Sequence, residues 1–142
     1  MENKYSIKVN AKPENIEKIA NFVEKNLKNI KIHKDALEEI LISIDEAISN
    51  VIQHSYTGSQ NGYIRLILTI TKKKVEVSIF DKGSIFEPNK IPSPNFSKNL
   101  NDRSLGGLGV FLMKKFMDEV TFTFKNKVDK KENELKMIKY LK

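Results

Sequence analysis

Hydrophobic residues recur along this chain with two different periods, and the order of those periods limits the possible folds. Apolar residues that alternate with polar ones predict strands at about residues 4–9, 63–71, 75–81, 120–124 and 134–141. Apolar residues spaced three and four apart predict helices at about 13–29, 34–54 and 110–117. This order predicts an α/β (α+β) two-layer sandwich, in which helices cover one face of a mixed, mainly antiparallel sheet.

The chain is long enough for one hydrophobic core. It has 142 residues, and a domain of that size buries roughly 68–70% of its unfolded surface. No internal repeat or linker divides it, so we expect a single domain over residues 1–142. From about residue 84 to 105 the periodicity disappears and three prolines occur. An irregular stretch of this length in a compact domain is typically a functional lid or binding loop, which we expect here.

Composition excludes several classes of site. The chain has no cysteine, which excludes disulfides, thiol catalysis and Cys-type zinc sites. Its two histidines are His33 and His54, too few for a His-rich metal centre. No apolar run approaches the ~20 residues that span a bilayer, and the first residues lack the apolar core of a signal peptide. We therefore expect a cytoplasmic protein that does not bind membranes.

The net charge is positive but carried almost entirely by lysine. Lys and Arg number 25 and Asp and Glu 18, a net charge of +7. Only Arg65 and Arg103 are arginines, and the lysines are scattered. Nucleic-acid readers usually use arginine forks and concentrate charge on one face, so we do not expect direct nucleic-acid binding. The charge fits either a solvated surface or attraction to an acidic partner or a polyphosphate.

The first candidate segment lies on the longest predicted helix. Glu46, Asn50 and His54 follow at intervals of four and so lie along one side of that helix. Glu46 stands about 160° from both Ile44 and Ile48, away from the apolar stripe. These residues either form the solvent-exposed side or carry chemistry, with Glu46 as a base and Asn50 as an oxygen ligand. Mg²⁺ suits such a site because it takes few protein oxygens and keeps waters and phosphates.

The second candidate segment follows the strand predicted at 75–81. Asp81, Lys82 and Gly83 come directly after its last buried residues. A carboxylate there can accept a hydrogen bond from an exocyclic amine such as that of adenine. Gly83, which has no Cβ, lets the backbone approach a flat ring. The alternative is an ordinary Asp-x-Gly turn.

The third candidate segment is a glycine-rich helix start. Gly106, Gly107 and Gly109 precede the helix predicted at 110–117. Backbone N–H groups and the partial positive charge at a helix N-terminus hold phosphates without side chains. Arg103 could fold over those phosphates with the lid. The alternatives are a flexible hinge and a surface arginine. Together, the three segments supply a metal ligand, an adenine acceptor and a phosphate cradle, which is a complete set for ATP.

At these residues the chain resembles the GHKL superfamily of ATP-binding proteins, which includes gyrase, MutL and histidine kinases. Residues 46–50 resemble its N box, 81–88 its first glycine box and 106–109 its second. More narrowly, the segments 45–56, 83–88 and 107–120 resemble the bacterial anti-sigma factor serine kinases. The similarity in element order extends over nearly the whole chain.

This resemblance implies the GHKL (Bergerat) fold with ATP between the helices and the lid. Asn50 would hold Mg²⁺, Asp81 would bind the adenine amine, and Gly83 would lie beneath the ring. The resemblance also assigns to the ATP site Phe86, Arg103, Gly106, Gly107 and Gly109, with His54 in a supporting role. Many members carry a Gly-Thr pair before the last strand, whose hydroxyl assists adenine recognition, but residues 130–135 contain neither.

The resemblance further implies an anti-sigma factor with ATP-dependent serine kinase activity. Glu46 would act as general base towards a serine of an anti-anti-sigma (STAS-type) protein. The unphosphorylated form of that protein would compete with a sigma factor for this chain, which would form a homodimer. One base, one metal ion and a positioning cradle are chemically sufficient for phosphoryl transfer.

Three other functions stay open at this point. The chain could be a non-catalytic module that clamps a regulatory partner in response to ATP. It could be the detached catalytic domain of a sensor histidine kinase, although neither His33 nor His54 lies in a dimerising helical hairpin. A basic nucleic-acid binder would show steeply salt-dependent binding to DNA.

Overall fold

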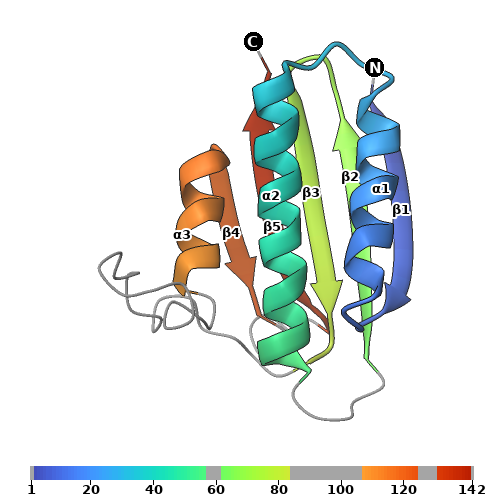
Figure 1. The fold of residues 1–142 in the computed structure, drawn as a ribbon, viewed down its shortest axis with the longest axis vertical. Coiled ribbons are helices and arrows are strands. Elements are labelled where there is room, and N and C mark those ends of the chain that lie inside the picture. Colours follow the sequence, from blue (N-terminus) through green and yellow to red (C-terminus); the bar gives the residue numbers. More distant parts are fainter. Residues whose placement is uncertain (1, 57–61, 84–106, 125–130, 142) are drawn as a thin grey trace.

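The structure, a computed structural model, has a layer of helices on a layer of strands (Figure 1). It describes residues 2–56, 62–83, 107–124 and 131–141. Its elements are β1 (Asn3–Asn10), α1 (Asn15–Leu27), α2 (Lys34–Asn50), the π-helix η1 (Val51–Ser55), β2 (Tyr63–Ile70), β3 (Lys74–Asp81), α3 (Gly107–Phe116), β4 (Glu119–Thr123) and β5 (Asn133–Tyr140). The predicted two-layer sandwich is confirmed. The lid expected at about 84–105 lies outside the described residues.

The five strands form one sheet in the order β1-β2-β3-β5-β4. Every pairing among these strands is antiparallel, so the sheet is more regular than the mixed one that the sequence predicts. The reason is the path of the chain after β3. It passes through α3 and returns along the sheet edge as β4, and β5 then enters between β3 and β4. As a result β5 is antiparallel to both of its neighbours.

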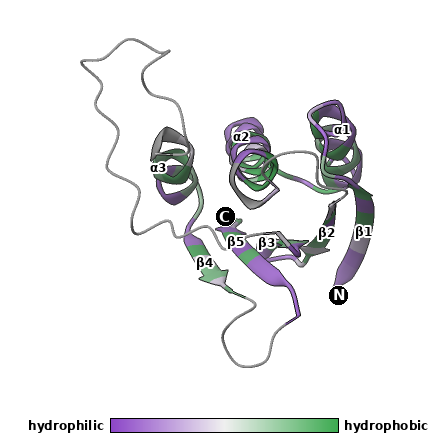
Figure 2. Cartoon of the chain, turned by 90° about the horizontal axis from the view of Figure 1, so that it is seen from below, coloured by the Kyte–Doolittle hydropathy of each residue, from purple (hydrophilic) through white to green (hydrophobic). Residues whose placement is uncertain are grey.

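The core lies between the sheet and a single row of helices. Figure 2 shows α1, α2 and α3 side by side on one face of the sheet. Alternate residues of β2 point towards them, and Ile64, Leu66 and Leu68 are at most 1% exposed. Such alternation is expected of strands with one covered face. None of the described helices is long and apolar enough to cross a membrane.

Helix α2 is the central element of the helix layer. It packs between α1 and α3 and buries Ile40, Ile44 and Ile48 against the sheet. The side chain of His33 caps its start, where Nδ1 accepts a hydrogen bond from the Asp35 N–H at 3.3 Å. The apolar spacing that predicts this helix therefore also sets its orientation over the sheet.

The end of α2 departs from the predicted continuous helix. The α-helix ends at Asn50, and the chain continues as one π-helical turn, Val51–Ser55. The N–H of Tyr56 donates to the carbonyl of Val51 at 3.1 Å, which is the wider hydrogen bond of a π turn. Such turns occur frequently at functional sites.

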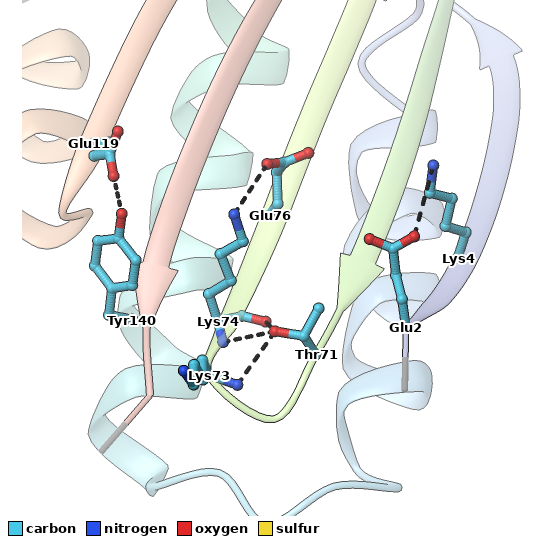
Figure 3. A network of polar contacts seen from close by, with 8 residues as sticks. All are labelled: Glu2, Lys4, Thr71, Lys73, Lys74, Glu76, Glu119 and Tyr140. Atoms are coloured by element: carbon cyan, nitrogen blue, oxygen red, sulfur yellow. Dashed lines mark hydrogen bonds and ion pairs between the residues drawn. The ribbon is translucent and has the colours of Figure 1, made fainter.

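The sheet has two contrasting ends. The turn between β2 and β3, residues 71–73, marks one of them, which we call the hairpin end. Figure 3 shows it closely: the Thr71 hydroxyl accepts hydrogen bonds from the backbone N–H groups of Lys73 and Lys74, at 3.2 and 3.1 Å. Nearby, the Tyr140 hydroxyl donates to the Glu119 carboxylate. The opposite end, where β3 ends and β5 begins, we call the site end.

Candidate functional site

The site end brings together residues that are far apart in the sequence. Asn50 is the last residue of α2, Asp81 the last of β3 and Asn133 the first of β5. Helix α3 begins at the same end with Gly107 (Figure 1). These elements run in the directions that collect their polar ends at one edge of the sandwich.

A pocket opens at this end beneath α2 and α3. Its cavity volume is about 30 Å³, and about 390 Å³ when the open solvent at its mouth is included. Polar side chains of Asn50, Asp81 and Asn133 line it, and these residues are 6%, 5% and 7% exposed. Its other lining residues are mainly apolar: Ala47, Val51, Met113, Phe122, Phe124, Glu134 and Leu135. A flat, apolar ring with polar groups at its edge suits such a surface.

The backbone of Gly83 and the side chain of Asn133 both hold the carboxylate of Asp81. The backbone N–H of Gly83 donates to Oδ1 at 2.9 Å, and the amide nitrogen of Asn133 donates to the same oxygen at 3.1 Å. Asn133 also donates to the Gly83 carbonyl at 3.1 Å. The segment after β3 is thereby folded back on its own aspartate, as in the Asp-x-Gly turn considered from the sequence.

Asn50 and Glu46 face the start of helix α3. A Cβ added to Gly109 would lie 2.8 Å from Glu46 Oε2 and 3.4 Å from Asn50 Nδ2. Only a residue without a side chain permits this approach. The structure therefore corrects the interpretation of Glu46 and Asn50 as a solvent-exposed side. Both residues lie away from the apolar side of α2 that faces the sheet, but α3 packs against the side of α2 that carries them.

Burial makes the Glu46 carboxyl a weaker acid than an ordinary glutamate. Loss of solvent raises the pKa of its carboxyl above the ordinary 4.5, and the neighbouring charge of Asp45 raises it further. Burial also raises the pKa of Asp45. A glutamate whose pKa is moved towards neutrality is a better general base than an ordinary one.

The amide nitrogen of Asn50 is buried and has no hydrogen-bond partner in the structure. An unpaired buried N–H donor is costly unless an acceptor, such as a phosphate oxygen of a ligand, completes it. Within the described ranges, no cluster of three or more His, Cys, Asp or Glu side chains could hold a metal ion by itself. The carboxamide oxygen of Asn50 is the kind of oxygen ligand that Mg²⁺ takes, so this residue fits a Mg²⁺ whose shell is completed by phosphates and water.

Tyr56 ties the end of α2 to the end of β3. Its hydroxyl donates to the Tyr63 carbonyl at 2.9 Å and accepts from the Lys82 N–H at 2.8 Å. Its ring fills the space beside Gly62, where an added Cβ would lie 2.2 Å away. Tyr56 therefore fixes the backbone directly after Asp81.

A charged pair closes the edge of the site end. The Arg65 guanidinium bonds the Glu132 carboxylate at 2.8 Å, and the Tyr63 hydroxyl donates to the same carboxylate. Burial opposes ionisation of Glu132, but these two bonds lower its pKa overall. Burial and the bond to Glu132 raise the pKa of Tyr63 to about 12. Glu132, the residue directly before β5, is thus anchored to β2.

The sequence predicts part of this arrangement. Glu46, Asn50, Asp81, Gly83 and Gly109 lie together at the site end, and the backbone of Gly107 begins α3. Outside the described residues lie Phe86, Arg103 and Gly106, and also the side chain of His54, whose backbone belongs to η1.

Sequence reasoning missed Asn133, Tyr56 and Gly62 as parts of the site. The segment 130–135 drew attention only because it lacks Gly and Thr. The sequence signal for Asn133 is an asparagine at the start of the last predicted strand. A polar residue at that position is easily interpreted as part of a turn.

The family profile of the histidine kinase-like ATPase domain matches residues 9–139. The chain belongs to this family. The serine-protein kinase RsbW of Staphylococcus aureus strain MSSA476 is 33% identical over 113 residues, covering 76% of this chain and 68% of the relative. RsbW of strain JH9 matches with the same identity and coverage. The chain is therefore a member of the serine-protein kinases within this family, which confirms the resemblance seen in the sequence.

Solved structures share the fold at low sequence identity. The RsbU and RsbW domains of Rv1364c from Mycobacterium tuberculosis match with a TM-score of 0.68 at 14% identity, over 98% of this chain and 32% of that one. This chain thus spans about a third of that structure. The histidine kinase domain of a blue-light activated kinase from Erythrobacter litoralis EL346 matches with a TM-score of 0.50 at 19% identity, over 75% of this chain and 45% of that one.

Proposed function

We propose that this kinase is an anti-sigma factor that phosphorylates an anti-anti-sigma protein on serine, with ATP as phosphoryl donor and Mg²⁺ as cofactor. The observation that carries the proposal is the meeting of Asn50, Asp81 and Gly109 at one end of the fold. These residues belong to three separate segments of the sequence, and an ATP site requires all three.

The adenine ring would lie in the apolar part of the pocket, with its amine donating to the Asp81 carboxylate. Gly83 is buried beside Asp81, to which its N–H donates, and would lie beneath the ring. The phosphates would lie at the N-terminus of α3, where unpaired backbone N–H groups attract anions. Asn50 would hold Mg²⁺, which, when bound, neutralises charge on the phosphates.

Glu46 would act on the substrate serine. Its carboxylate accepts the proton of the serine hydroxyl as the serine oxygen bonds to the γ-phosphorus. The bond from that phosphorus to the β,γ-bridging oxygen breaks, and ADP leaves with the electron pair. The raised pKa of Glu46 supports this role.

The resemblance to the anti-sigma factor serine kinases supports a proposal for the protein partners. We assign to this chain a STAS-type anti-anti-sigma substrate, a sigma factor that competes with it, and a homodimeric state. With such partners, its activity would be cytoplasmic. Phosphorylation of the substrate would abolish its competition and leave the sigma factor sequestered.

Nucleotide binding is tested first, by thermal unfolding with Mg-ATP, Mg-GTP or no nucleotide. A ligand that binds only the folded state raises its stability, by about 2.7 kcal/mol at a concentration of 100 Kd. We expect Mg-ATP to raise the Tm and Mg-GTP to have little effect. Equal Tm values in all three conditions would contradict the ATP site.

Transfer is tested with radiolabelled ATP and a candidate anti-anti-sigma protein encoded near this chain. The expected product is a phosphoserine on that protein, formed only with Mg²⁺. Binding of ATP without transfer to any such partner would instead favour the non-catalytic ATP-responsive module.

A further inference from the structure

Asn133 is a buried carboxamide that faces the same pocket as Asp81. It starts β5 and lies directly opposite Asp81 of β3 in the strand register. It is 7% exposed, and the pocket that it lines also includes Asn50. A buried amide requires specific partners, so its bonds show what it holds in place.

The amide nitrogen of Asn133 makes two bonds to acceptors. It donates to Asp81 Oδ1 at 3.1 Å and to the Gly83 carbonyl oxygen at 3.1 Å. A carboxylate and a carbonyl oxygen only accept, so the nitrogen must face them and the amide oxygen must point away. This chemistry fixes the orientation of the Asn133 amide.

Asp81 is thus bonded to both Gly83 and Asn133. The N–H of Gly83 donates to the same Oδ1 at 2.9 Å. Two donors on one oxygen restrict rotation of the carboxylate, and the bond to the Gly83 carbonyl fixes the backbone that donates to it. Loss of the Asn133 side chain would remove one donor to Oδ1 and the bond to the Gly83 carbonyl.

We propose that Asn133 is the positioning residue that sets the preference of this site for a purine with an exocyclic amine. The proposal rests on the proposed ATP site and names what makes that site selective. A carboxylate accepts an amine hydrogen well only when it lies near the plane of the ring, and Asn133 holds Asp81 in one plane before ligand arrives.

The test compares two nucleotides that differ only in that amine. ATP and purine riboside 5′-triphosphate, which has hydrogen in place of the amine, are titrated with Mg²⁺ by calorimetry into the wild type, Asn133→Ala and Asn26→Ala. Asn26 is a matched control, because its amide also donates to a backbone carbonyl, that of Phe22 at 2.9 Å, far from the site. We expect Asn133→Ala to weaken the binding of ATP about 10-fold, which corresponds to one charge-assisted hydrogen bond. The binding of purine riboside triphosphate should weaken by less than about 2-fold, because this nucleotide makes no such bond.

The ratio of the two affinities separates the outcomes. Equal weakening of both nucleotides in Asn133→Ala would mean that Asn133 only supports packing and would overturn the proposal. Unchanged affinities would also overturn it. A wild type that binds neither nucleotide would overturn the proposed ATP site itself, together with this inference.

A second measurement does not depend on the variant folding. The side-chain NH₂ resonances of Asn133 in the ¹⁵N-labelled wild type report directly on its two bonds. We expect ATP to shift them clearly more than purine riboside triphosphate does. Identical shifts with both nucleotides would contradict a role in reading the amine.

Discussion

The two ends of the sheet handle polar groups in opposite ways. At the hairpin end, backbone groups are paired locally. The Thr71 hydroxyl accepts hydrogen bonds from the N–H groups of Lys73 and Lys74. The backbone N–H of Thr71 donates to the Lys74 carbonyl at 3.0 Å. At the site end, Asn50 and Asp81 are buried, and the amide nitrogen of Asn50 has no partner. Leaving such a group unpaired costs roughly 1–3 kcal/mol.

This difference indicates what each end is for. The hairpin end contributes stability through bonds that are complete within the chain. The site end retains a buried amide nitrogen, that of Asn50, whose hydrogen bonding a ligand would complete. Substitutions at the two ends should therefore separate stability from function.

The largest effect is expected for Glu46→Gln. Glutamine keeps the shape but cannot take the serine proton, so the rate of phosphoryl transfer should fall by about 10²–10⁴-fold. Mg-ATP should still bind, and the Tm should not fall, because the variant removes a buried charge. Glu38→Gln, on the exposed side of the same helix, is the control and should transfer normally. Normal transfer by Glu46→Gln would refute the assignment of the base.

The pH profile of transfer tests the same carboxylate. Protonated Glu46 cannot act as a base, so the rate should fall about tenfold for each pH unit below its pKa. Because burial raises that pKa, the decline should begin above pH 4.5, the ordinary value for glutamate. The sign for stability is opposite: the folded state binds this proton more readily than the unfolded state, so protonation of Glu46 contributes stability as the pH falls. A rate that stays constant down to pH 4.5 would argue against this base.

Gly109→Ala should disturb the site with little effect on stability. The new Cβ would lie 2.8 Å from Glu46 Oε2, the movable end of a side chain, so Glu46 would shift rather than the helices. Transfer should fall about 10- to 100-fold, as expected for a misplaced reacting group. The free energy of unfolding should change by less than about 1 kcal/mol, since alanine also favours the helix. A urea titration beside the rate assay checks both, with Lys114→Ala on the exposed side of α3 as control.

Asn50→Leu should weaken the binding of Mg-ATP without lowering the stability of the protein. Leucine has a similar size and removes the unpaired amide, so the ligand-free protein should be as stable as the wild type or more stable. The Mg²⁺-dependent part of ATP affinity should weaken about 10-fold or more, because the oxygen ligand is lost. Thermal unfolding with and without Mg-ATP measures both quantities. An unchanged Mg-ATP shift would show that Asn50 does not serve the metal.

Thr71→Ala should give the smallest change and the opposite pattern. It removes the hydroxyl that accepts from Lys73 and Lys74, at a cost of about 1 kcal/mol of unfolding free energy. Thr71→Ser keeps the hydroxyl and should restore most of that stability. ATP affinity should be the same in all three proteins, and a change in affinity would break the separation between the two ends.

Local spacing in the sequence predicts the elements well, and some of the site. The four-residue interval places Glu46 and Asn50 on one side of α2, and the Asp-x-Gly pattern marks the end of β3. The sequence cannot show that α3 covers Glu46, because that contact depends on how two helices pack over the sheet.

The partnership of Asp81 with Asn133 was equally inaccessible. These residues are paired by the register of β3 and β5, although α3 and β4 lie between those strands in the chain. No periodicity within either strand specifies that register. The π turn before Tyr56 likewise follows from tertiary contacts of Tyr56 with β2 and β3 rather than from the apolar pattern.

An NMR titration of the ¹⁵N-labelled chain with Mg²⁺ and a non-hydrolysable ATP analogue tests the central claim most directly. The account predicts that the resonances of Asn50, Gly83 and Gly109 shift together, with one dissociation constant. Those of Thr71 and Tyr140 at the hairpin end should stay in place. Shifts confined to the hairpin end, or different dissociation constants for the three site residues, would contradict a single magnesium-nucleotide site.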